Sequence, residues 1–486
     1  MDHPHVPIAR AGGDLTRPST DARPMRVVVL GTGYVGLTAA ACLAELGHRV
    51  TGLDVDEALV ERLGAGIVHI VEEGLADLVG AGLASGNLSF AAAPAAAPTV
   101  PAPGGCDGSV GGIVDTASVA LARADVVLLC LPTPTRADGS LDVAFVEGAA
   151  RWIGPILAPG AVVVTKSTVP VGTHVALAEW LDRDDIAVVS NPEFLREGTA
   201  VRDFAEPDRV VVGGDDPAAV GRVAALYATI DAPVLTMDAA SAELVKVGAN
   251  AFLAARLSMV NELSRLCERV GADIDDVTAG LGSDHRIGAT FLRPGPGWGG
   301  SCFPKDTRGL VHLAASVGLR APVVEAAIES NEEHVAHVVA TVAAAAGGTL
   351  RGRRIAVWGL TFKAGTDDCR DSPALRVVEG LVAAGAEVVA TDPAARVQPS
   401  GVRIVADAAA AAEGADVVVV ATEWPEFAAV DLADVADGMR GAVIVDTRDV
   451  IDPLSARCAG LTLRRLGRTH GDVAAIVDRP ALAGVA

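Results

Sequence analysis

Residues 26–54 read RVVVLGTGYVGLTAAACLAELGHRVTGLD, and this stretch decides the fold expected for the first part of the chain. An apolar run, a glycine turn, a helical period and a second apolar run predict strand, turn, helix and strand. In the GxGxxG turn, Gly31 permits a tight bend, Gly33 lets a pyrophosphate approach, and Gly36 allows close helix packing. Asp54 ends the second strand, where a carboxylate can hold both ribose hydroxyls and repel a 2′-phosphate. We expect NAD binding here, with a purely structural glycine turn as the alternative.

Strand and helix patterns alternate along most of the chain, which predicts an α/β protein. Strand-and-turn patterns recur at 124–134, 161–173 and 186–194. A second strand–helix–strand unit is expected at 353–393, and further strands at 415–424 and 441–451. Residues 239–271 instead keep a helical period without proline, which is long for a globular helix and typical of one that spans domains or packs against a second copy. We therefore expect two Rossmann-like doubly wound parallel-sheet domains, joined by a central helical domain with one long helix.

The expected domain boundaries follow from these patterns and from composition. A Pro/Ala/Gly stretch at 91–112 is typical of a flexible insertion, and the N-terminal residues are typical of a disordered tail. The expected segments are a tail at 1–24, an NAD-binding Rossmann domain at 25–238, a central helical and dimerisation domain at 239–349, a C-terminal Rossmann-like domain at 350–470, and a tail at 471–486.

Charge and cysteine usage exclude several classes of function. The net charge of −22 argues against nucleic-acid binding, which needs clusters of Lys and Arg. The seven cysteines are widely spaced without a CxxC pair, so we expect neither a disulfide framework nor a metal site. The N-terminus lacks the apolar core of a signal peptide and no stretch is typical of a membrane span, so we expect a cytoplasmic protein.

The stretch GWGGSCFPKD, at 297–306, places one cysteine in a glycine-rich segment. The glycines predict an irregular loop of close approach, in which a thiol is accessible. Lys305 and Asp306 follow Cys302 within four residues, and a nearby cation favours the thiolate. We interpret Cys302 as a nucleophile, and a small inert loop residue is the alternative.

Two further groups of charged residues adjoin apolar segments. Lys246 and Asn250 lie one turn apart on the long predicted helix, with Glu243 one turn earlier. Their neighbours allow a buried lysine, and a solvated polar stripe is the alternative. Glu193 and Glu197 follow a strand in NPEFLREGT, at 191–199, where carboxylates of a doubly wound sheet lie near the ligand crevice. Solvated loop charges are the alternative there.

The ordered set of motifs resembles the UDP-glucose/GDP-mannose dehydrogenase family over residues 25–470. The matching stretches are GTGYVG, LPTP with DGSLD, KSTVPVGT, NPEFLREGTAVRDFAEPDRVVVGG, ELVKVGANAFLA, HRIGATFLRPGPGWGGSCFPKD and GLTFKAGTDDCRDSP. NPEFLREGTA, GGSCFPKD and the FKAGTDD segment look most like the UDP-glucose 6-dehydrogenase branch. The resemblance implies oxidation of a sugar C6 alcohol to a carboxylate with two NAD⁺ reduced, through a thiohemiacetal and a thioester on Cys302. It also implies that the C-terminal domain binds the nucleotide sugar.

The resemblance assigns roles to individual residues. As catalytic groups it implies Cys302, Lys246, Asp306, Asn250, Glu193 and Thr168. As cofactor contacts it implies Gly31, Gly33, Tyr34, Val35, Gly36, Asp54, Thr133, Thr168, Glu197, Lys305 and Arg370. As substrate contacts it implies Glu193, Phe194, Leu195, Lys246, Asn250, Arg286, Phe291, Gly295, Gly299, Lys363 and Arg448. Arg286 matches an arginine that reaches into a neighbouring subunit, so we expect a homodimer or a higher homo-oligomer.

The sequence departs from the family pattern in several places. Trp298 stands where Tyr or Phe is usual, Leu59 stands where a basic residue often meets the cofactor, and HIVEEGL at 69–75 replaces a more proline-rich stretch.

Alternatives to the oxidation of UDP-glucose stay open. One is the same chemistry on dTDP-glucose, GDP-mannose or UDP-N-acetylmannosamine. A non-catalytic nucleotide-sugar-binding protein and a one-step dehydrogenase of hydroxy acids are the remaining alternatives.

Overall fold

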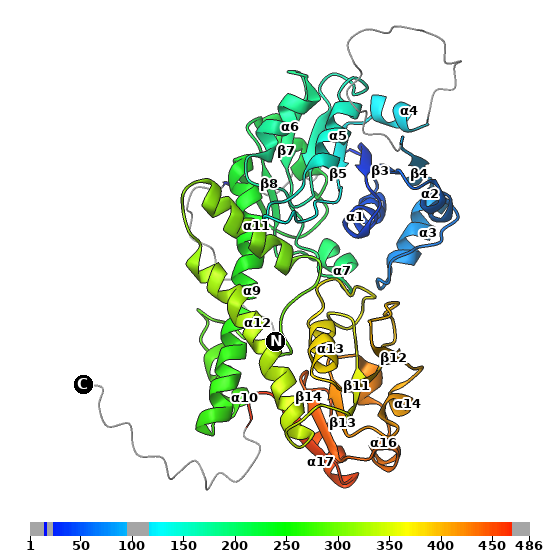
Figure 1. Ribbon diagram of the computed structural model, residues 1–486. Helices are drawn as coiled ribbons and strands as arrows, with labels where there is room; N and C mark the ends of the chain where they lie inside the picture. The colour runs from blue at the N-terminus through cyan, green and yellow to red at the C-terminus, as the bar shows by residue number, and fades with distance from the viewer. Residues whose placement is uncertain (1–13, 17–22, 95–115, 469–486) are drawn as a thin grey trace, which may run out of the picture. The chain divides into compact units, whose positions relative to one another are not determined.

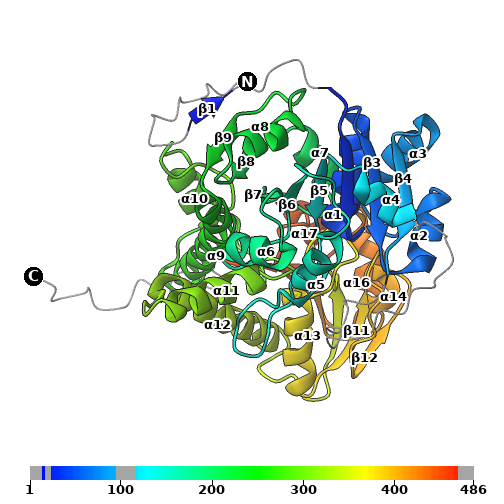
Figure 2. The same ribbon diagram turned by 90° about the horizontal axis from the view of Figure 1, so that it is seen from above.

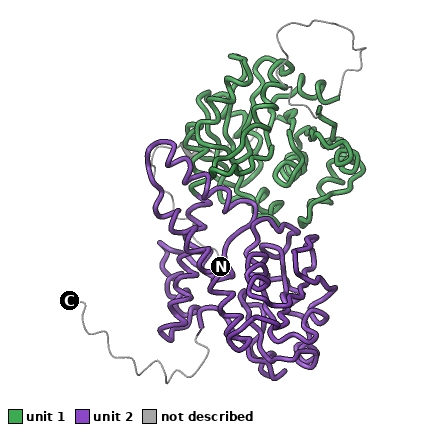
Figure 3. Tube along the Cα trace, in the orientation of Figure 1, with its two compact units in different colours: residues 1–248 green, residues 249–486 purple. Residues whose placement is uncertain are grey.

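The computed structural model describes residues 14–16, 23–94 and 116–468. The chain divides into two compact units, residues 1–248 and 249–486 (Figure 3). Both units contain a sheet with helices, as the sequence predicts for an α/β protein. The boundary between the units falls inside α9 (Ala239–Val270), the long helix expected at 239–271. The domain boundaries expected at 239 and 350 stay predictions.

The first unit is built on a nine-stranded sheet in the order β1-β9-β8-β7-β6-β5-β2-β3-β4 (Figures 1 and 2). From β4 to β7 the strands are parallel and follow the order of a doubly wound fold, with the reversal between β2 and β5. Its strands are β1 (Asp14–Thr16), β2 (Arg26–Leu30), β3 (Arg49–Asp54), β4 (Leu88–Ala92), β5 (Val126–Leu129), β6 (Val162–Thr165), β7 (Ala187–Ser190), β8 (Val210–Gly213) and β9 (Val234–Met237).

Helices cover both faces of this sheet because the central strands are apolar on both sides. On β2, Val27 and Val29 join one buried cluster with α1 and α8, while Val28 and Leu30 join another with α5 and α6. The helices are α1 (Tyr34–Glu45), α2 (Glu57–Gly64), α3 (Leu75–Ser85), α4 (Thr116–Ala122), α5 (Ala144–Ile153), α6 (Thr173–Leu181), α7 (Ala200–Ala205) and α8 (Pro217–Ala225).

Two segments expected to be irregular are partly regular. Within the stretch expected as a disordered tail, residues 14–16 form β1, whose backbone pairs antiparallel with the edge strand β9. Ala91 and Ala92, expected to begin the flexible insertion, instead end β4 and pair with Leu53 and Asp54. Edge pairing supplies backbone partners that the composition of these segments does not reveal. Residues 95–112 and 471–486 lie outside the described residues.

The second unit contains a six-stranded, all-parallel sheet in the order β12-β11-β10-β13-β14-β15. This order repeats the doubly wound pattern of the first unit. The strands are β10 (Arg354–Trp358), β11 (Glu387–Thr391), β12 (Val402–Ile404), β13 (Val417–Val420), β14 (Val443–Asp446) and β15 (Thr462–Arg465). The helices are α10 (Ile274–Gly282), α11 (Phe303–Ser316), α12 (Pro322–Ala345), α13 (Pro373–Ala383), α14 (Ala408–Ala412), α15 (Pro425–Ala428), α16 (Leu432–Gly438) and α17 (Pro453–Cys458).

Helix α12 connects the helical part of this unit with its sheet (Figures 1 and 2). Toward its C-terminus, Val338 and Val342 are fully buried in the cluster that covers the sheet. Nearer its N-terminus, the carbonyl of Ala327 accepts a hydrogen bond of 2.7 Å from Ser258 Oγ of α9. Helix α12 thus packs on the sheet near its C-terminus and on α9 near its N-terminus. These two contacts fix the positions of the polar side chains on the middle of α12.

Candidate active site

The glycine turn between β2 and α1 has the geometry that its spacing predicts. Gly31 has a φ of 87°, and a Cβ there would lie 2.5 Å from the carbonyl oxygen of Cys130. A Cβ on Gly36 would lie 1.9 Å from the carbonyl oxygen of Gly31. Gly33 caps α1 without a side-chain hydrogen bond, and nothing lies within 4 Å of its missing Cβ. The turn therefore presents the helix N-terminus to open space, which is where a dinucleotide pyrophosphate binds in this fold.

Asp54 ends β3 beside this turn. Its Oδ2 accepts hydrogen bonds from Thr32 N at 2.7 Å and from Thr32 Oγ1 at 2.9 Å, and its Oδ1 accepts one from Asp56 N at 3.1 Å. The carboxylate is thereby oriented but only partly buried. These residues fit the adenosine side of a nicotinamide dinucleotide, because an ionised carboxylate at this strand end binds ribose hydroxyls.

Tyr34, in the same turn, reaches a residue that sequence reasoning missed. Its hydroxyl donates to Glu72 Oε2, and Gly198 N donates to both the Tyr34 hydroxyl and Glu72 Oε2 at 2.7 Å. Burial, followed by the hydrogen bond to Glu72, raises the pKa of Tyr34 far above its ordinary value. Glu72 lies in the stretch at 69–75, which the sequence distinguishes only as a departure from the family pattern. The loop that carries Glu197 is thus tied to the glycine turn.

Lys246 and Glu193 form a buried ion pair within the first unit. The Lys246 Nζ to Glu193 Oε1 distance is 2.8 Å, and the two side chains are 5% and 7% exposed. Burial alone would raise the pKa of Glu193, but the charge and hydrogen bond of Lys246 and the Leu195 N–H hold it below its usual value. Lys246 Nζ also lies 5.5 Å from the centre of the Phe194 ring. The interpretations of these residues as a solvated stripe and as solvated loop charges are therefore wrong for Lys246 and Glu193.

Glu243, one turn before Lys246, is buried for a structural reason. Its carboxylate accepts hydrogen bonds from Gly172 N at 2.7 Å and from His174 N at 2.9 Å. These are backbone groups at the N-terminus of α6, which has no other side-chain cap. Glu243 is thus a helix cap supplied by a distant segment.

Thr133 and Thr168 follow neighbouring strands, β5 and β6. The hydroxyl of Thr133 donates to the carbonyl oxygen of Thr168 at 2.7 Å. This contact brings together two residues expected to face the cofactor, as the carboxyl ends of adjacent parallel strands require.

In the second unit, Cys302 is the N-cap residue of α11, so the helix starts directly after it. The thiol is partly exposed, and its Sγ lies 3.5 Å from Ser301 Oγ. One turn into the helix, Asp306 is fully buried and accepts from Asn250 Nδ2 at 2.5 Å and from Lys305 Nζ at 2.6 Å. The structure thus brings Asn250 together with Lys305 and Asp306 in the first turn of α11, the helix that Cys302 caps.

The glycines before Cys302 are required by packing within the chain. A Cβ on Gly299 would lie 2.0 Å from the carbonyl oxygen of Asp371, and one on Gly300 would lie 2.9 Å from the Phe362 ring. The close approach that these two glycines predict is thus made within the chain, by the segment 362–371. Trp298 is 5% exposed, its indole N–H donates to Ser258 Oγ at 2.9 Å, and its ring meets Phe303 edge-on.

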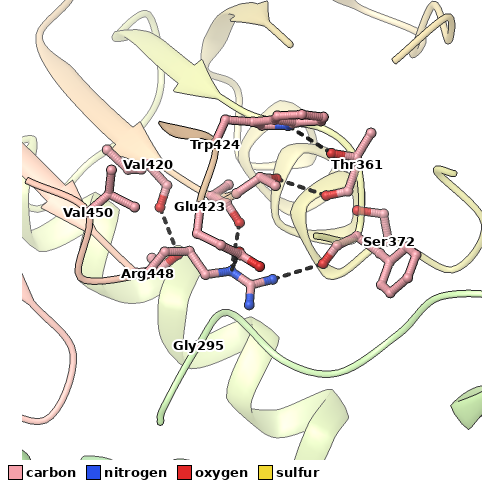
Figure 4. Close-up of polar contacts among 12 residues, drawn as sticks. Gly295, Thr361, Ser372, Val420, Glu423, Trp424, Arg448 and Val450 are labelled. Atoms are coloured by element: carbon pink, nitrogen blue, oxygen red, sulfur yellow. Dashed lines mark hydrogen bonds and ion pairs between the residues drawn. The ribbon is translucent and has the colours of Figure 1, made fainter. Parts of the chain in front are cut away.

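Arg448 organises the polar contacts at the carboxyl ends of β13 and β14 (Figure 4). It donates to the carbonyl oxygens of Ala421 at 3.1 Å and Phe362 at 3.0 Å, and it pairs with Glu423 at 3.2 Å. Its Nη1 would lie 3.2 Å from a Cβ on Gly295. Lys363 follows Phe362 directly, so the structure groups three of the residues expected to contact substrate: Arg448, Gly295 and Lys363.

Other expected site residues have local partners. Arg286 pairs with Asp284 at 3.0 Å, and Arg370 pairs with Asp368 at 2.9 Å; both arginines are exposed. Phe291 has a φ of 56°, an uncommon conformation for a residue with a Cβ. Within residues 14–16, 23–94 and 116–468, no cluster of potential metal ligands and no helix able to cross a membrane is found.

Comparisons with known proteins cover nearly all of this chain. The UDP-glucose/GDP-mannose dehydrogenase family matches at residues 25–100 and 113–231 (NAD-binding domain), 240–333 (central domain) and 356–453 (UDP-binding domain). The UDP-glucose 6-dehydrogenase of Rhizobium meliloti is 40% identical, over 91% of this chain and 100% of its own length. That of Bacillus subtilis is 37% identical, over 91% and 93%.

Solved structures agree with these matches. A UDP-glucose dehydrogenase from Pyrobaculum islandicum has a TM-score of 0.80 and 37% identity, over 93% of this chain and 99% of its own. A UDP-N-acetylmannosamine dehydrogenase from Pyrococcus horikoshii has a TM-score of 0.78 and 27% identity, over 91% and 99%. The chain belongs to the UDP-glucose/GDP-mannose dehydrogenase family.

Proposed function

We propose that this enzyme is a UDP-glucose 6-dehydrogenase, which oxidises the C6 alcohol of UDP-glucose to the carboxylate of UDP-glucuronate. The observation that carries the proposal is Cys302 at the N-cap of α11, followed one turn later by the buried Asn250–Asp306 contact. The curated relatives matching most of the chain at 37–40% identity are UDP-glucose 6-dehydrogenases, which favours this sugar nucleotide.

NAD is the proposed cofactor, and when bound it supplies the hydride acceptor for both oxidations. The residues that would hold it are the glycine turn with Tyr34 and Val35 at the N-terminus of α1, and Asp54 at the ribose. A 2′-phosphate would meet the negative charge of Asp54, which favours NAD over NADP. Further proposed contacts are Thr133, Thr168, Glu197, Lys305 and Arg370.

The proposed role of Cys302 is to carry the substrate between the two oxidations. Its thiolate attacks the C6 aldehyde, a C–S bond forms, and the carbonyl oxygen becomes the hydroxyl of a thiohemiacetal. Loss of a hydride and a proton from this adduct gives a thioester, and water then breaks the C–S bond to release the carboxylate and the thiol. The N-terminus of α11 stabilises the thiolate because the helix dipole is positive there.

The remaining polar groups are proposed to handle protons and developing charge. Lys246, held by Glu193, would donate to the developing alkoxide, and Asn250 with Asp306 would orient water and the oxyanion. Arg448 and Lys363 would meet the substrate's phosphates, because cationic side chains bind phosphate oxygens strongly. Further proposed substrate contacts are Phe194, Leu195, Arg286, Phe291, Gly295 and Gly299.

Replacement Cys302→Ser tests the chemistry. We expect the variant to form no net acid and to stop at the aldehyde or at a stalled covalent species, as measured by NADH yield per UDP-glucose and by mass spectrometry. Full four-electron oxidation by this variant would rule out the thioester route and favour a one-step or cysteine-independent dehydrogenase. Initial rates with UDP-glucose, dTDP-glucose, GDP-mannose and UDP-N-acetylmannosamine test the substrate, and preference for any of the last three overturns it.

A homodimer or higher homo-oligomer is also part of the proposal. On α9, Phe252, Met259 and Leu266 are spaced seven residues apart and are 70%, 58% and 55% exposed, which forms an apolar stripe suited to a second copy. Light scattering of the wild type and of Met259→Glu measures the oligomeric state. A wild-type dimer that Met259→Glu dissociates supports the proposal, and a monomeric wild type contradicts it.

The proposed compartment is the cytoplasm, which a reduced thiol at Cys302 and the use of NAD favour.

A further inference from the structure

The segment at 295–300, which leads to Cys302, is a buried piece of irregular chain. Gly295, Trp298, Gly299 and Gly300 are buried, and Gly297 has a φ of 134°. Buried backbone N–H and C=O groups outside helices and strands need partners from elsewhere. The identity of those partners decides what holds this segment in place.

Side chains of α9 and α12 supply the partners. Gly295 N donates to Asn261 Oδ1 of α9 at 3.1 Å, and Gly295 O accepts from His334 Nε2 of α12 at 2.7 Å. Trp298 N donates to Asn331 Oδ1 at 2.9 Å, and Trp298 O accepts from Asn331 Nδ2 at 2.9 Å. Both main-chain groups of both residues are thus satisfied by side chains.

Asn331 and His334 are one helical turn apart, so α12 presents them together. Asn331 uses its acceptor and its donor on the same residue, which fixes the orientation of the Trp298 peptide groups on both sides. The carbonyl of Gly295 can only accept, so Nε2 of His334 carries a proton. Burial, more than the nearby charges, lowers the pKa of His334 to about 4, which keeps the ring neutral across the physiological range.

The path from these contacts to the thiol is short and constrained. Three residues separate Trp298 from Cys302, and two of them, Gly299 and Gly300, pack against Asp371 and the Phe362 ring. From Cys302 onward, α11 is regular. The position of Cys302 at the helix N-terminus therefore depends on where the Trp298 backbone is held.

We propose that Asn331 and His334 are positioning residues for Cys302, acting through the backbone of residues 295–298. This inference rests on the proposed role of Cys302 as the nucleophile. Misplacement of a reacting group by about 1 Å costs up to about a hundredfold in rate. Loss of these contacts thus lowers kcat and the reactivity of the thiol, while the affinity for the nucleotide part of the substrate is retained.

Asn331→Asp is the decisive variant because it is isosteric and changes one contact. The introduced carboxyl group, when ionised, keeps the acceptor for Trp298 N but sets an anionic oxygen against Trp298 O, whereas its protonated form can donate there again. We expect Cys302 alkylation by iodoacetamide in the free enzyme to slow by about tenfold or more at neutral pH. The ratio of wild-type to variant rates should fall toward one as the pH is lowered.

Mass spectrometry of the tryptic peptide 287–305 measures the alkylation of Cys302 alone, because Cys302 is the one cysteine in this peptide. Val342→Ala, a buried change on α12 away from the segment, is the matched control for lost stability and should leave the alkylation rate unchanged. His334→Gln, which keeps a donor, should retain more thiol reactivity than His334→Leu. The two His334 variants test the inference if Asn331→Asp does not fold.

Alkylation and kcat of Asn331→Asp within about twofold of wild type, or a ratio that does not change with pH, would overturn the inference. So would equal losses in His334→Gln and His334→Leu, because a purely structural role predicts no rescue by a donor. These outcomes are distinct from failure of the proposed function. If Cys302→Ser still completes the oxidation, the function is wrong, whereas the alkylation rates still report where the thiol is held.

Discussion

The buried pair of Lys246 and Glu193 gives a prediction whose magnitude depends on pH. Replacement Lys246→Met removes the cation but keeps a side chain of similar length, so Glu193 loses its ion-pair partner in a site where it is 7% exposed. Breaking a buried pair on one side costs about 3–5 kcal/mol, because a charge is left buried without compensation. We expect a loss of that size in the free energy of unfolding at about pH 7.5.

The pH dependence should reverse between wild type and variant. In the wild type, the folded-state pKa of Glu193 lies below its unfolded value, so the pair stabilises above about pH 4.3 and its contribution is lost as pH falls. Without Lys246, burial dominates and raises the folded-state pKa above the unfolded value. The neutral acid is then favoured, so the variant's deficit should shrink as pH falls toward about 5.

Urea unfolding followed by tryptophan fluorescence, with hydrogen exchange across 187–195 as a local readout, measures both effects. The double variant Lys246→Met/Glu193→Gln should be more stable than Lys246→Met at neutral pH, because it removes the unpaired charge. Arg202→Met breaks an exposed pair with Glu206 and should change nothing measurable. A deficit for Lys246→Met below about 1 kcal/mol that is constant with pH would refute the reasoning.

Two further predictions concern the glycine turn and Trp298. Gly36→Ala places a Cβ 1.9 Å from Gly31 O, so we expect the affinity for NAD⁺ to fall by more than about tenfold. Calorimetric titration measures this affinity, and the circular dichroism spectrum should stay unchanged. Unchanged affinity would contradict the role of the turn. Trp298→Phe removes the indole hydrogen bond to Ser258, so we expect the free energy of unfolding, measured in urea, to fall by about 1 kcal/mol. If Trp298→Phe causes the same loss in a Ser258→Ala background, the hydrogen bond contributes nothing.

Features set by local pattern could be predicted from the sequence. The strand, glycine turn and helix at 26–54 and the long helix at 239–271 match β2, α1, β3 and α9 because their periodicity and glycine spacing are local signals. Both doubly wound sheets follow from the same alternation. Cys302, Asn250 and Asp306 were singled out as site residues, and the structure adds that Cys302 caps a helix.

Features set by distant partners could not be predicted in this way. Glu72 reaches Tyr34 and Gly198 from a stretch that has no pattern of its own. Glu243 resembled a member of a polar stripe until α6 supplied the backbone groups that it caps. The glycines at 299 and 300 predict a loop of close approach, but the local pattern does not reveal that the segment at 362–371 makes this approach. In each case the physical reason is a partner far away in the sequence.

The turns that follow β2 and β10, one in each sheet, show how far this limit extends. Gly359 repeats the left-handed conformation of Gly31, and Asp392 holds the N–H and hydroxyl of Thr361 as Asp54 holds those of Thr32. Asp392 also accepts from Leu360 N, from Ala394 N and Ala395 N, and from the Trp424 indole.

Both carboxylates accept hydrogen bonds on both oxygens, but Asp392 accepts from more residues than Thr361 alone, whereas the donors to Asp54 come from Thr32 and Asp56. An acidic residue at the end of the second strand is therefore not by itself a ribose ligand. Among these additional donors, Ala394 and Ala395 are near neighbours of Asp392, whereas Trp424 lies more than thirty residues beyond it and joins it only in the folded chain. We expect tertiary contacts that supply or withhold hydrogen-bond donors to decide whether such a carboxylate can bind a ribose, because similar local geometry is compatible with either role.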